Sequence, residues 1–215
     1  MRVLITGSNG QLGSEINELE NNYNKVDLIF KDLPELDICN FEALETFIID
    51  HKINSVINCA AYTAVDKAAE DAEIAERVNS IGVSNLVNAL KKVDGKLIHI
   101  STDYVFDGDH FSPYKESDLV SPIGVYGETK RAGELSVINS DIDSIVIRTS
   151  WLYSSYGNNF VKTMLRLGNE KENLGVIFDQ VGTPTYARDL AKTCLEILTG
   201  ANSVKISKDG DLYHY

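Results

Sequence analysis

The feature that most constrains the fold is a regular alternation of short apolar runs with longer segments of helical periodicity. The apolar runs hold many β-branched residues and few polar ones, which is typical of strands buried on both faces of a sheet. Strands are therefore predicted over residues 3–6, 26–30, 56–59, 97–101, 145–148 and 176–178. A chain that alternates strand and helix in this way builds a parallel, doubly wound α/β sheet with right-handed crossovers.

Helices are predicted between these runs. Leu12, Ile16 and Leu19 recur at helical spacing, so their side chains share one face. Asn40 is a residue type that favours the position just before a helix. The same periodicity predicts further helices over residues 41–48, 73–90 and 160–167.

Two stretches depart from this alternation. Residues 106–123 are rich in turn-forming residues, and a loop of this length in a compact domain is usually functional, so we expect a lid or a substrate loop. The sequence changes character after Ser150, where Trp151 and two tyrosines precede the amphipathic segment at residues 160–167. We expect residues 1–150 to form a dinucleotide-binding domain and residues 151–215 to form a substrate-binding region interleaved with the last elements of the sheet. The chain stops inside an expected strand, GDLYHY, so this region is expected to be incomplete at its C-terminal end.

The charge balance narrows the classes of partner. The formal net charge of -12 disfavours nucleic acids and acidic membranes, because both require a basic surface. No stretch approaches the roughly 18 apolar residues of a membrane span, and no secretory signal precedes the first apolar run. Cys39, Cys59 and Cys194 are too few and too scattered for a disulfide framework or a metal site. A soluble protein of the reducing cytoplasm is predicted.

The first turn of the predicted sheet carries three glycines at three-residue spacing, in the stretch LITGSNGQLGSE. In a doubly wound sheet of Rossmann type, this turn meets the pyrophosphate of a dinucleotide. Gly7 can form the tight turn, Gly10 lets the backbone approach a phosphate without a Cβ, and Gly13 permits close packing of helix on sheet. Free N–H groups at the start of the helix then face an anion. An ordinary turn is the alternative, because the spacing differs from the commonest fingerprint, GxGxxG.

The second strand is expected to end near the adenosine ribose, where an acidic residue favours a free 2′-hydroxyl and a basic one accommodates a 2′-phosphate. The chain offers Lys31, Asp32 and Asp37 at this place. Asp32 favours NADH and Lys31 tolerates NADPH, while an exposed polar turn explains either residue equally well. The residues alone therefore leave the choice between the two cofactors open.

A tyrosine and a lysine lie four residues apart in VYGETKRAGE, at the start of a predicted helix. Tyr126 and Lys130 therefore share one helix face. A neighbouring lysine cation favours the phenolate, and a phenol tuned in this way can give its proton to a carbonyl oxygen as hydride reaches the carbon. Thr102 follows the fourth predicted strand and could hydrogen-bond the same oxygen.

Each of these residues also has an ordinary structural explanation. Most YxxxK pairs decorate an exposed helix, Thr102 could cap a strand end, and Asp103 could be a turn residue. Their order along the chain decides the interpretation. A glycine turn after strand one, a hydroxyl after strand four and YxxxK on the following helix are independent features, and their joint occurrence favours a nicotinamide site.

With these motifs the chain resembles the extended short-chain dehydrogenase/reductase family, and within it the dTDP-4-dehydrorhamnose reductases. The similar segments cover nearly the whole chain: LITGSNGQLGSE, VINCAAYTAVDKAAED, RVNSIGVSNLVNAL, ISTDYVFDG, PIGVYGETKRAGE, IRTSWLYSSYGNNFVKTML and DQVGTPTYARDLA. Of these, AYTAVDKA, STDYVFDG and RTSWLY are the most specific. The resemblance implies that NADPH, or NADH, reduces the C4 ketone of dTDP-4-dehydro-L-rhamnose to give dTDP-L-rhamnose, a precursor of bacterial surface polysaccharide.

The resemblance also implies roles for individual residues. Contacts with the cofactor would come from Gly10, Gln11, Leu12, Asp37, Ile38, Ala61, Tyr62 and Thr63. Tyr126 would donate the proton, and Lys130 would bind the nicotinamide ribose and lower the pKa of the phenol. Thr102 would tune Tyr126 and touch the substrate. Asp103 and Trp151 would face the sugar or the nucleotide, although a partly exposed core aromatic is the structural alternative for Trp151.

Two other functions stay open. A nucleotide-sugar epimerase or dehydratase of the same family would share the fold, although a dehydratase normally adds an acid pair beside the threonine and here only Asp103 follows Thr102. A non-catalytic protein that resembles the regulatory subunit of methionine adenosyltransferase is the second alternative, and the presence of Tyr126 and Lys130 counts against it. A homodimer and a divalent metal such as magnesium are also left open.

Overall fold

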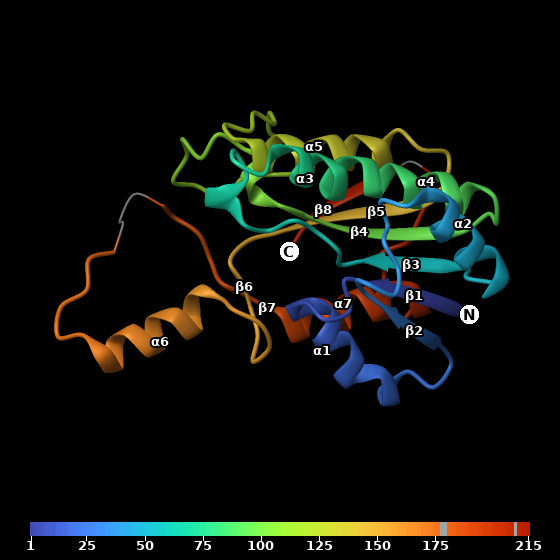
Figure 1. Cartoon of the computed structure of the whole chain (residues 1–215), viewed down its shortest axis with the longest axis horizontal. Coiled ribbons are helices and arrows are strands. Elements are labelled where there is room, and N and C mark those ends of the chain that lie inside the picture. Colours follow the sequence, from blue (N-terminus) through green and yellow to red (C-terminus); the bar gives the residue numbers. More distant parts are fainter. Residues whose placement is uncertain (177–179, 209) are drawn as a thin grey trace.

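The centre of the molecule is a six-stranded sheet with the strand order β2-β1-β3-β4-β5-β8. The computed structural model describes residues 1–176, 180–208 and 210–215. Every neighbouring pair of strands in this sheet is parallel. The strands are β1 (Arg2–Thr6), β2 (Asp27–Lys31), β3 (Ser55–Asn58), β4 (Lys96–Thr102), β5 (Asp143–Thr149) and β8 (Asp211–His214). Helices cover both faces (Figure 1), so the predicted doubly wound α/β sheet is confirmed.

The predicted strands agree closely with the observed ones. The first five are found as β1 to β5, with ends that differ by one or two residues. The closing stretch GDLYHY forms β8, which pairs with β5. The sixth predicted strand, over residues 176–178, includes residues 177 and 178, which lie outside the described part of the chain.

Two helical layers enclose the sheet. Helices α1 (Gln11–Leu19) and α7 (Ala187–Thr199) pack on one face; α2 (Phe41–Asp50), α4 (Gly82–Lys91) and α5 (Val125–Ile138) pack on the other. Side chains alternate along β1 accordingly, because Val3 and Ile5 join the cluster below α1 and α7 while Leu4 joins the opposite cluster. Each such side chain contributes about 1.5–3 kcal/mol by leaving water. In the described parts of the chain, no helix combines the length and the apolar character needed to cross a bilayer.

The segment predicted as one helix over residues 73–90 is divided in the structure. It consists of α3 (Ala72–Glu76), a π-helical turn (Arg77–Ile81) and α4. A π-helical turn widens the backbone by one residue and is frequent at functional sites. The turn places Asn79, which is fully buried, below the end of β3.

The strand order creates one crevice at the carboxyl edge of the sheet. The chain leaves β1 toward β2 and returns on the other side of β1 to form β3, so β1 and β3 flank the point at which the winding reverses. Thr6 and Asn58 end these two strands side by side, and Thr102 of β4 pairs with Thr149 of β5. Ligands of such sheets bind outside this edge.

A second, smaller unit follows β5. Strands β6 (Leu152–Tyr153) and β7 (Thr185–Tyr186) form a two-stranded parallel sheet, in which the rings of Tyr153 and Tyr186 stack with centroids 5.4 Å apart. Between them, α6 (Phe160–Glu170) extends away from the main sheet (Figure 1) and contains no buried residue. The helix predicted over residues 160–167 is therefore confirmed and is three residues longer.

Candidate active site

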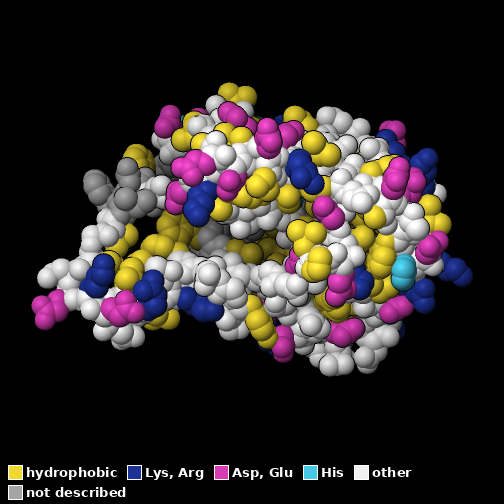
Figure 2. Space-filling model, viewed as in Figure 1, with side chains coloured by type: hydrophobic (Ala, Val, Ile, Leu, Met, Phe, Trp, Pro, Cys, Tyr) yellow, Lys and Arg dark blue, Asp and Glu magenta, His cyan; other side chains and the backbone are white. Residues whose placement is uncertain are grey.

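One pocket of about 870 Å³ opens at the carboxyl edge of the main sheet. Figure 2 shows its mouth as a hollow between the body of the molecule and α6. A volume of this size suits a small-molecule ligand. The predicted site residues that line it are Gly7, Gly10, Gln11, Leu12, Asp32, Asp37, Ile38, Ala61, Tyr62, Thr63, Thr102, Asp103, Tyr126, Lys130 and Trp151. The structure therefore brings both ends of the predicted site into one cavity.

The glycine turn forms one end of the pocket. Gly7 has a φ of +61°, and a Cβ there would lie 2.6 Å from the backbone nitrogen of Ala60, so only glycine fits. Gly13 lies outside the pocket wall, and its Cβ would meet the Cα of Ser8 at 2.5 Å. The predicted packing role of Gly13 is consistent with this contact.

Gly10 differs from the other two glycines because its surroundings are open. A Cβ at Gly10 would meet one atom, the carbonyl oxygen of Gly7, at 3.2 Å. Gly10 is the residue before α1 and supplies no side-chain cap. The first N–H groups of a helix have no acceptor within the helix, and they carry the positive end of its dipole. This end of the pocket is therefore suited to an anion such as a phosphate.

The two aspartates after β2 both line the pocket, but their carboxylates already have backbone donors. Asp32 accepts hydrogen bonds from the N–H groups of Asn9 at 2.9 Å and Leu33 at 2.8 Å. Asp37 accepts one from Cys39 N at 2.8 Å. Lys31 forms an ion pair with Glu35. These contacts fix the turn after β2, and they do not distinguish a 2′-hydroxyl from a 2′-phosphate.

The segment after β3 is held in the pocket by the π-helical turn. Asn79 accepts a hydrogen bond from Tyr62 N at 2.9 Å and donates one to Tyr62 O at 3.1 Å. Its amide also donates to the hydroxyl of Thr129 at 3.2 Å, one residue before Lys130. The sequence analysis missed Asn79, because helical periodicity does not reveal a π-helical turn. Ala61, Tyr62 and Thr63 owe their place in the pocket wall to it.

The first turn of α5 brings Tyr126 beside Thr102. A Cβ on Gly127 would lie 2.2 Å from the carbonyl oxygen of Tyr104, so glycine alone allows α5 to approach the turn that follows β4. The rings of Tyr104 and Tyr126 meet edge to face, with centroids 5.5 Å apart. Burial raises the pKa of the Tyr126 phenol to about 12, opposed by a hydrogen bond with Thr102 and reinforced by Asp103 and Tyr104. The phenol therefore carries its proton throughout the neutral range.

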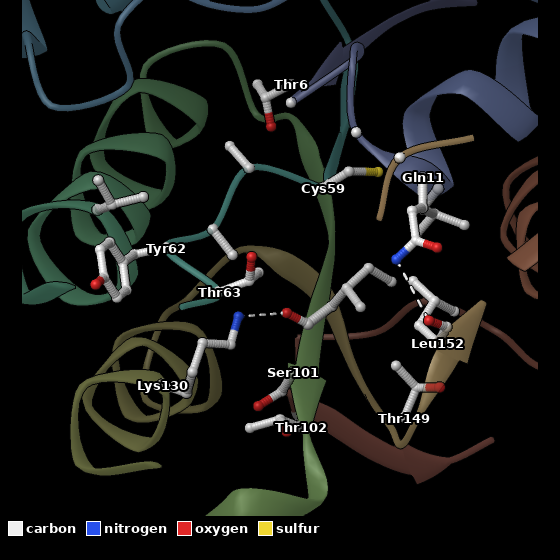
Figure 3. Close-up of a pocket in the computed structure, with 18 of the residues that line it drawn as sticks. Thr6, Gln11, Cys59, Tyr62, Thr63, Ser101, Thr102, Lys130, Thr149 and Leu152 are labelled. Atoms are coloured by element: carbon white, nitrogen blue, oxygen red, sulfur yellow. Dashed lines mark hydrogen bonds between the residues drawn. The ribbon is translucent and has the colours of Figure 1, made fainter. Parts of the chain in front are cut away.

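Lys130 is 2% exposed and donates from Nζ to the carbonyl oxygen of Ile100 at 2.7 Å (Figure 3). Burial lowers the pKa of its ammonium group to about 8, and the charge of Glu134 opposes that change. The effect of Lys130 on the pKa of Tyr126 stays a prediction, because Lys130 is not among the groups that shift this pKa here. Burial is the largest influence on the pKa of the phenol, and the lysine ammonium group donates to the backbone oxygen of Ile100.

Thr102 and Asp103 lie at the end of β4. The Thr102 hydroxyl accepts from Tyr104 N at 3.2 Å and donates to the Asp103 carboxylate at 3.2 Å. Burial raises the pKa of Asp103, and its hydrogen bonds with Thr102 and Tyr104 oppose that rise. Thr102 thus caps the turn after β4, as the structural explanation proposed, and also faces the pocket.

Trp151 lies at the opposite wall, in a backbone conformation with a φ of +47°. Its ring meets Phe160 edge to face, with centroids 4.9 Å apart. A Cβ on Gly182 would lie 2.6 Å from its indole nitrogen. Trp151 is half-buried in this corner and contributes to the pocket wall.

A buried ion pair behind Lys130 was missed by the sequence analysis. Glu134, one turn after Lys130, accepts from the Arg148 Nε at 2.7 Å and from its second terminal nitrogen at 2.8 Å. The Arg148 guanidinium also lies over the ring of Phe106, 5.0 Å from its centroid. Two features of the sequence could have indicated this pair. Glu134 follows Lys130 by four residues, and Arg148 lies inside an apolar strand.

Other residues of the pocket wall were also missed. They include Cys59, Ser101, Thr149, Ser150 and Phe160. The first four lie at strand ends, which is the signal that could have found them. None of the described residues 106–123 lines the pocket; this predicted lid instead approaches β8, where Glu116 accepts from His214 N at 2.9 Å. The described residues contain no group of three or more side chains able to hold a metal ion.

Known proteins resemble this chain over its whole length. The model of the family described as RmlD substrate binding domain matches residues 1–215. A curated dTDP-4-dehydrorhamnose reductase from Aggregatibacter actinomycetemcomitans is 42% identical over 214 residues, which are 100% of this chain and 72% of the relative. The reductase of the same name from Escherichia coli K12 is 40% identical over 195 residues, 89% of this chain and 64% of the relative. Across the curated relatives, the chain spans between 61% and 72% of their length.

Solved structures give the same picture. A dTDP-4-dehydrorhamnose reductase from Clostridium acetobutylicum superposes with a TM-score of 0.92 and 44% identity, over 100% of this chain and 74% of that one. The Bacillus anthracis reductase, solved in complex with NADP, has a TM-score of 0.90 and 42% identity, with the same coverage. A dTDP-glucose 4,6-dehydratase from Streptomyces venezuelae has a TM-score of 0.83 at 19% identity, and this likeness shows the fold alone.

Proposed function

The chain belongs to the family described as RmlD substrate binding domain, and from this premise we propose that it reduces the C4 ketone of dTDP-4-dehydro-L-rhamnose to dTDP-L-rhamnose with NADPH. The observation that carries the proposal is one pocket that is lined by Gly10 and the start of α1 and also by Thr102, Tyr126 and Lys130. Relatives named as dTDP-4-dehydrorhamnose reductases support the same substrate.

The residues of the pocket fit the cofactor in the following way. The N–H groups of Gln11 and Leu12 hold the pyrophosphate at the start of α1. Gly10, whose own N–H donates to Gly7 O at 3.0 Å, leaves room for it because a Cβ there would fill the cradle. Asp37 and Ile38 flank the adenine, and Asp32 lies near the ribose. The segment from Ala61 to Thr63 borders the ribose and the nicotinamide. NADPH is preferred over NADH in this proposal because the Bacillus anthracis relative was solved with NADP.

The chemistry of the chain is the delivery of a proton to the C4 oxygen. Bound NADPH supplies the hydride to the C4 carbon. Tyr126 gives its phenolic proton to the carbonyl oxygen. The raised pKa of this phenol keeps the proton on Tyr126 at neutral pH until the transfer. Thr102 touches the substrate beside the same oxygen, and its hydrogen bond with Tyr126 orients the phenol. The Lys130 ammonium binds the nicotinamide ribose and offsets the negative charge that develops on the phenol oxygen.

The remaining parts of the proposal concern the substrate and the setting of the protein. Asp103 and Trp151 face the sugar or the nucleotide across the pocket. Residues 1–150 act as the dinucleotide-binding domain, and residues 151–215 contribute the substrate-binding region. A cytoplasmic location belongs to this proposal, because Cys39, Cys59 and Cys194 are all free.

The test is a turnover assay with the purified protein. We expect loss of NADPH absorbance when dTDP-4-dehydro-L-rhamnose is added, with formation of dTDP-L-rhamnose identified by chromatography. A UDP-linked 4-ketohexose serves as the control substrate and should react slowly. Conversion of a nucleotide sugar without net consumption of NADPH would favour the epimerase alternative, and binding without any turnover would favour the non-catalytic alternative.

The pH dependence of this reaction follows from Lys130. Its pKa is about 8, so the ammonium is present below that value and is lost as the pH rises through it. Tyr126, with a pKa of about 12, keeps its proton over the same range. We therefore expect kcat/KM for NADPH to be flat near pH 6 to 7 and to fall about tenfold per pH unit above pH 8.

Lys130→Arg is the matched variant for the pH experiment, because a guanidinium stays charged over this range. Its turnover should be lower at every pH, and the descent near pH 8 should disappear. A descent that persists unchanged in Lys130→Arg would assign the titration to another group.

A further inference from the structure

One face of α1 is joined by hydrogen bonds to the segment that leads into α6. Gln11, Glu15 and Glu18 share this face and contact residues 152–159; we call these contacts the α1 seam. Gln11 Nε2 donates to Leu152 O at 3.3 Å (Figure 3), and Gln11 Oε1 accepts from Asn159 Nδ2 at 2.9 Å. The side chain of Gln11 is therefore engaged at both ends of its amide.

The other two members of the face extend the seam. Glu15 is 1% exposed, and its carboxylate accepts a hydrogen bond from the Ser154 hydroxyl at 2.6 Å. Glu18 accepts one from the Tyr156 hydroxyl at 2.7 Å. Successive turns of α1 thus contact the same segment, from the first residue of the helix to its last turn.

The seam matters because α6 has little other support. The helix contains no buried residue, and its first turn is capped by Asn159, whose side-chain oxygen accepts from Lys162 N at 3.0 Å. The next residue, Phe160, meets Trp151 edge to face and lines the pocket with it. Asn159 therefore caps α6 and binds the side chain of Gln11, and it directly precedes Phe160 in the pocket wall.

From this arrangement we propose that the side chain of Gln11, with Glu15 and Glu18, is a positioning element for the substrate side of the pocket. The cofactor phosphate meets only the backbone N–H groups at the start of α1. The proposal rests on the function proposed above for its kinetic part. Helix α1 thus has two roles: its N-terminus binds the cofactor, and one of its faces positions the pocket wall that contains Trp151.

The test compares three substitutions on one helix and its partner segment. Gln11→Ala and Asn159→Ala each break the 2.9 Å contact, and Asn17→Ala changes an exposed residue of α1 as the matched control. The first two should raise KM for the sugar nucleotide by about tenfold, as expected for the loss of one or two hydrogen bonds. The Kd for NADPH, measured by calorimetry, should change by less than twofold. The double variant should add little to either single one, since both remove the same contact.

A second readout needs no turnover. Trp151 is the single tryptophan of the chain, so its fluorescence reports on this wall alone. Gln11→Ala and Asn159→Ala should shift its emission to longer wavelength and increase quenching by iodide, whereas Asn17→Ala should match the unmodified protein. If neither the unmodified protein nor any variant reduces the sugar nucleotide, the proposed function is wrong. The fluorescence still tests whether the α1 seam positions Trp151. Unchanged fluorescence together with a tenfold weaker Kd for NADPH in Gln11→Ala would overturn the inference. It would show that the side chain of Gln11 binds the cofactor phosphate instead.

Discussion

Replacing Tyr126 with phenylalanine is expected to lower kcat for the reduction of dTDP-4-dehydro-L-rhamnose by a factor of about 10² to 10⁴. This is the range that a positioned proton donor contributes to a reaction. The ring remains, so its edge-to-face contact with Tyr104 is kept and the pocket keeps its shape. Binding of NADPH should change little, because the phenol is assigned to the substrate oxygen.

Stopped-flow single-turnover kinetics and calorimetry with NADPH separate the two effects. Tyr23→Phe is the matched control, because it removes a phenolic hydroxyl from a residue outside the pocket wall. Turnover in Tyr126→Phe within threefold of the unmodified protein would remove Tyr126 from the mechanism.

Replacing Gly10 with valine is expected to weaken NADPH binding by a hundredfold or more while the fold stays intact. The backbone at Gly10 has φ -74° and ψ 177°, an extended conformation that valine adopts readily. The single atom near its Cβ is the Gly7 oxygen at 3.2 Å, so the methyl groups would project into the open space before α1. A phosphate could then no longer reach the first N–H groups of the helix.

Calorimetry with NADPH measures this loss, and a thermal melt checks the fold. Gly168→Val is the control, because Gly168 lies on α6 with no atom within 4 Å of its Cβ position. Gly13 offers a contrast, since its Cβ would meet Ser8 at 2.5 Å and a substitution there should lower the melting temperature instead. Unchanged affinity for NADPH in Gly10→Val would contradict the phosphate cradle.

The parallel sheet could be predicted because its strands are short, apolar and β-branched on both faces, a pattern that few other structures produce. The helix expected over 73–90 shows the limit of this reasoning. Its apolar spacing is continuous, yet the chain forms a π-helical turn at Arg77–Ile81. In this turn Asn79 contacts Tyr62 and Thr129, which are 17 and 50 residues away along the chain, so helical periodicity does not reveal these contacts.

Gly10 and Thr102 could be predicted because they follow strands, and the ligand rule for doubly wound sheets names these positions in advance. Tyr126 lies on α5 and was found by its spacing from Lys130. All three line the pocket, and their roles stay proposals. The contact between Gln11 and Asn159 spans 148 residues of sequence, and no local pattern encodes such a pairing. The raised pKa of the Tyr126 phenol could not be predicted, because the burial that raises it depends on tertiary packing.

The small β6–β7 sheet fixes the two ends of the segment between its strands, so the length of that segment can change at little cost in stability. Leu152 pairs with Thr185 and Tyr153 with Tyr186, so the two ends of the segment 154–184 are held side by side. Changing the length of a segment whose ends are already fixed costs little, about 0.6 kcal/mol for each doubling. The part of this segment that follows the contacts of Ser154, Tyr156 and Asn159 with α1 can therefore change in length with little effect on the stability of the six-stranded sheet.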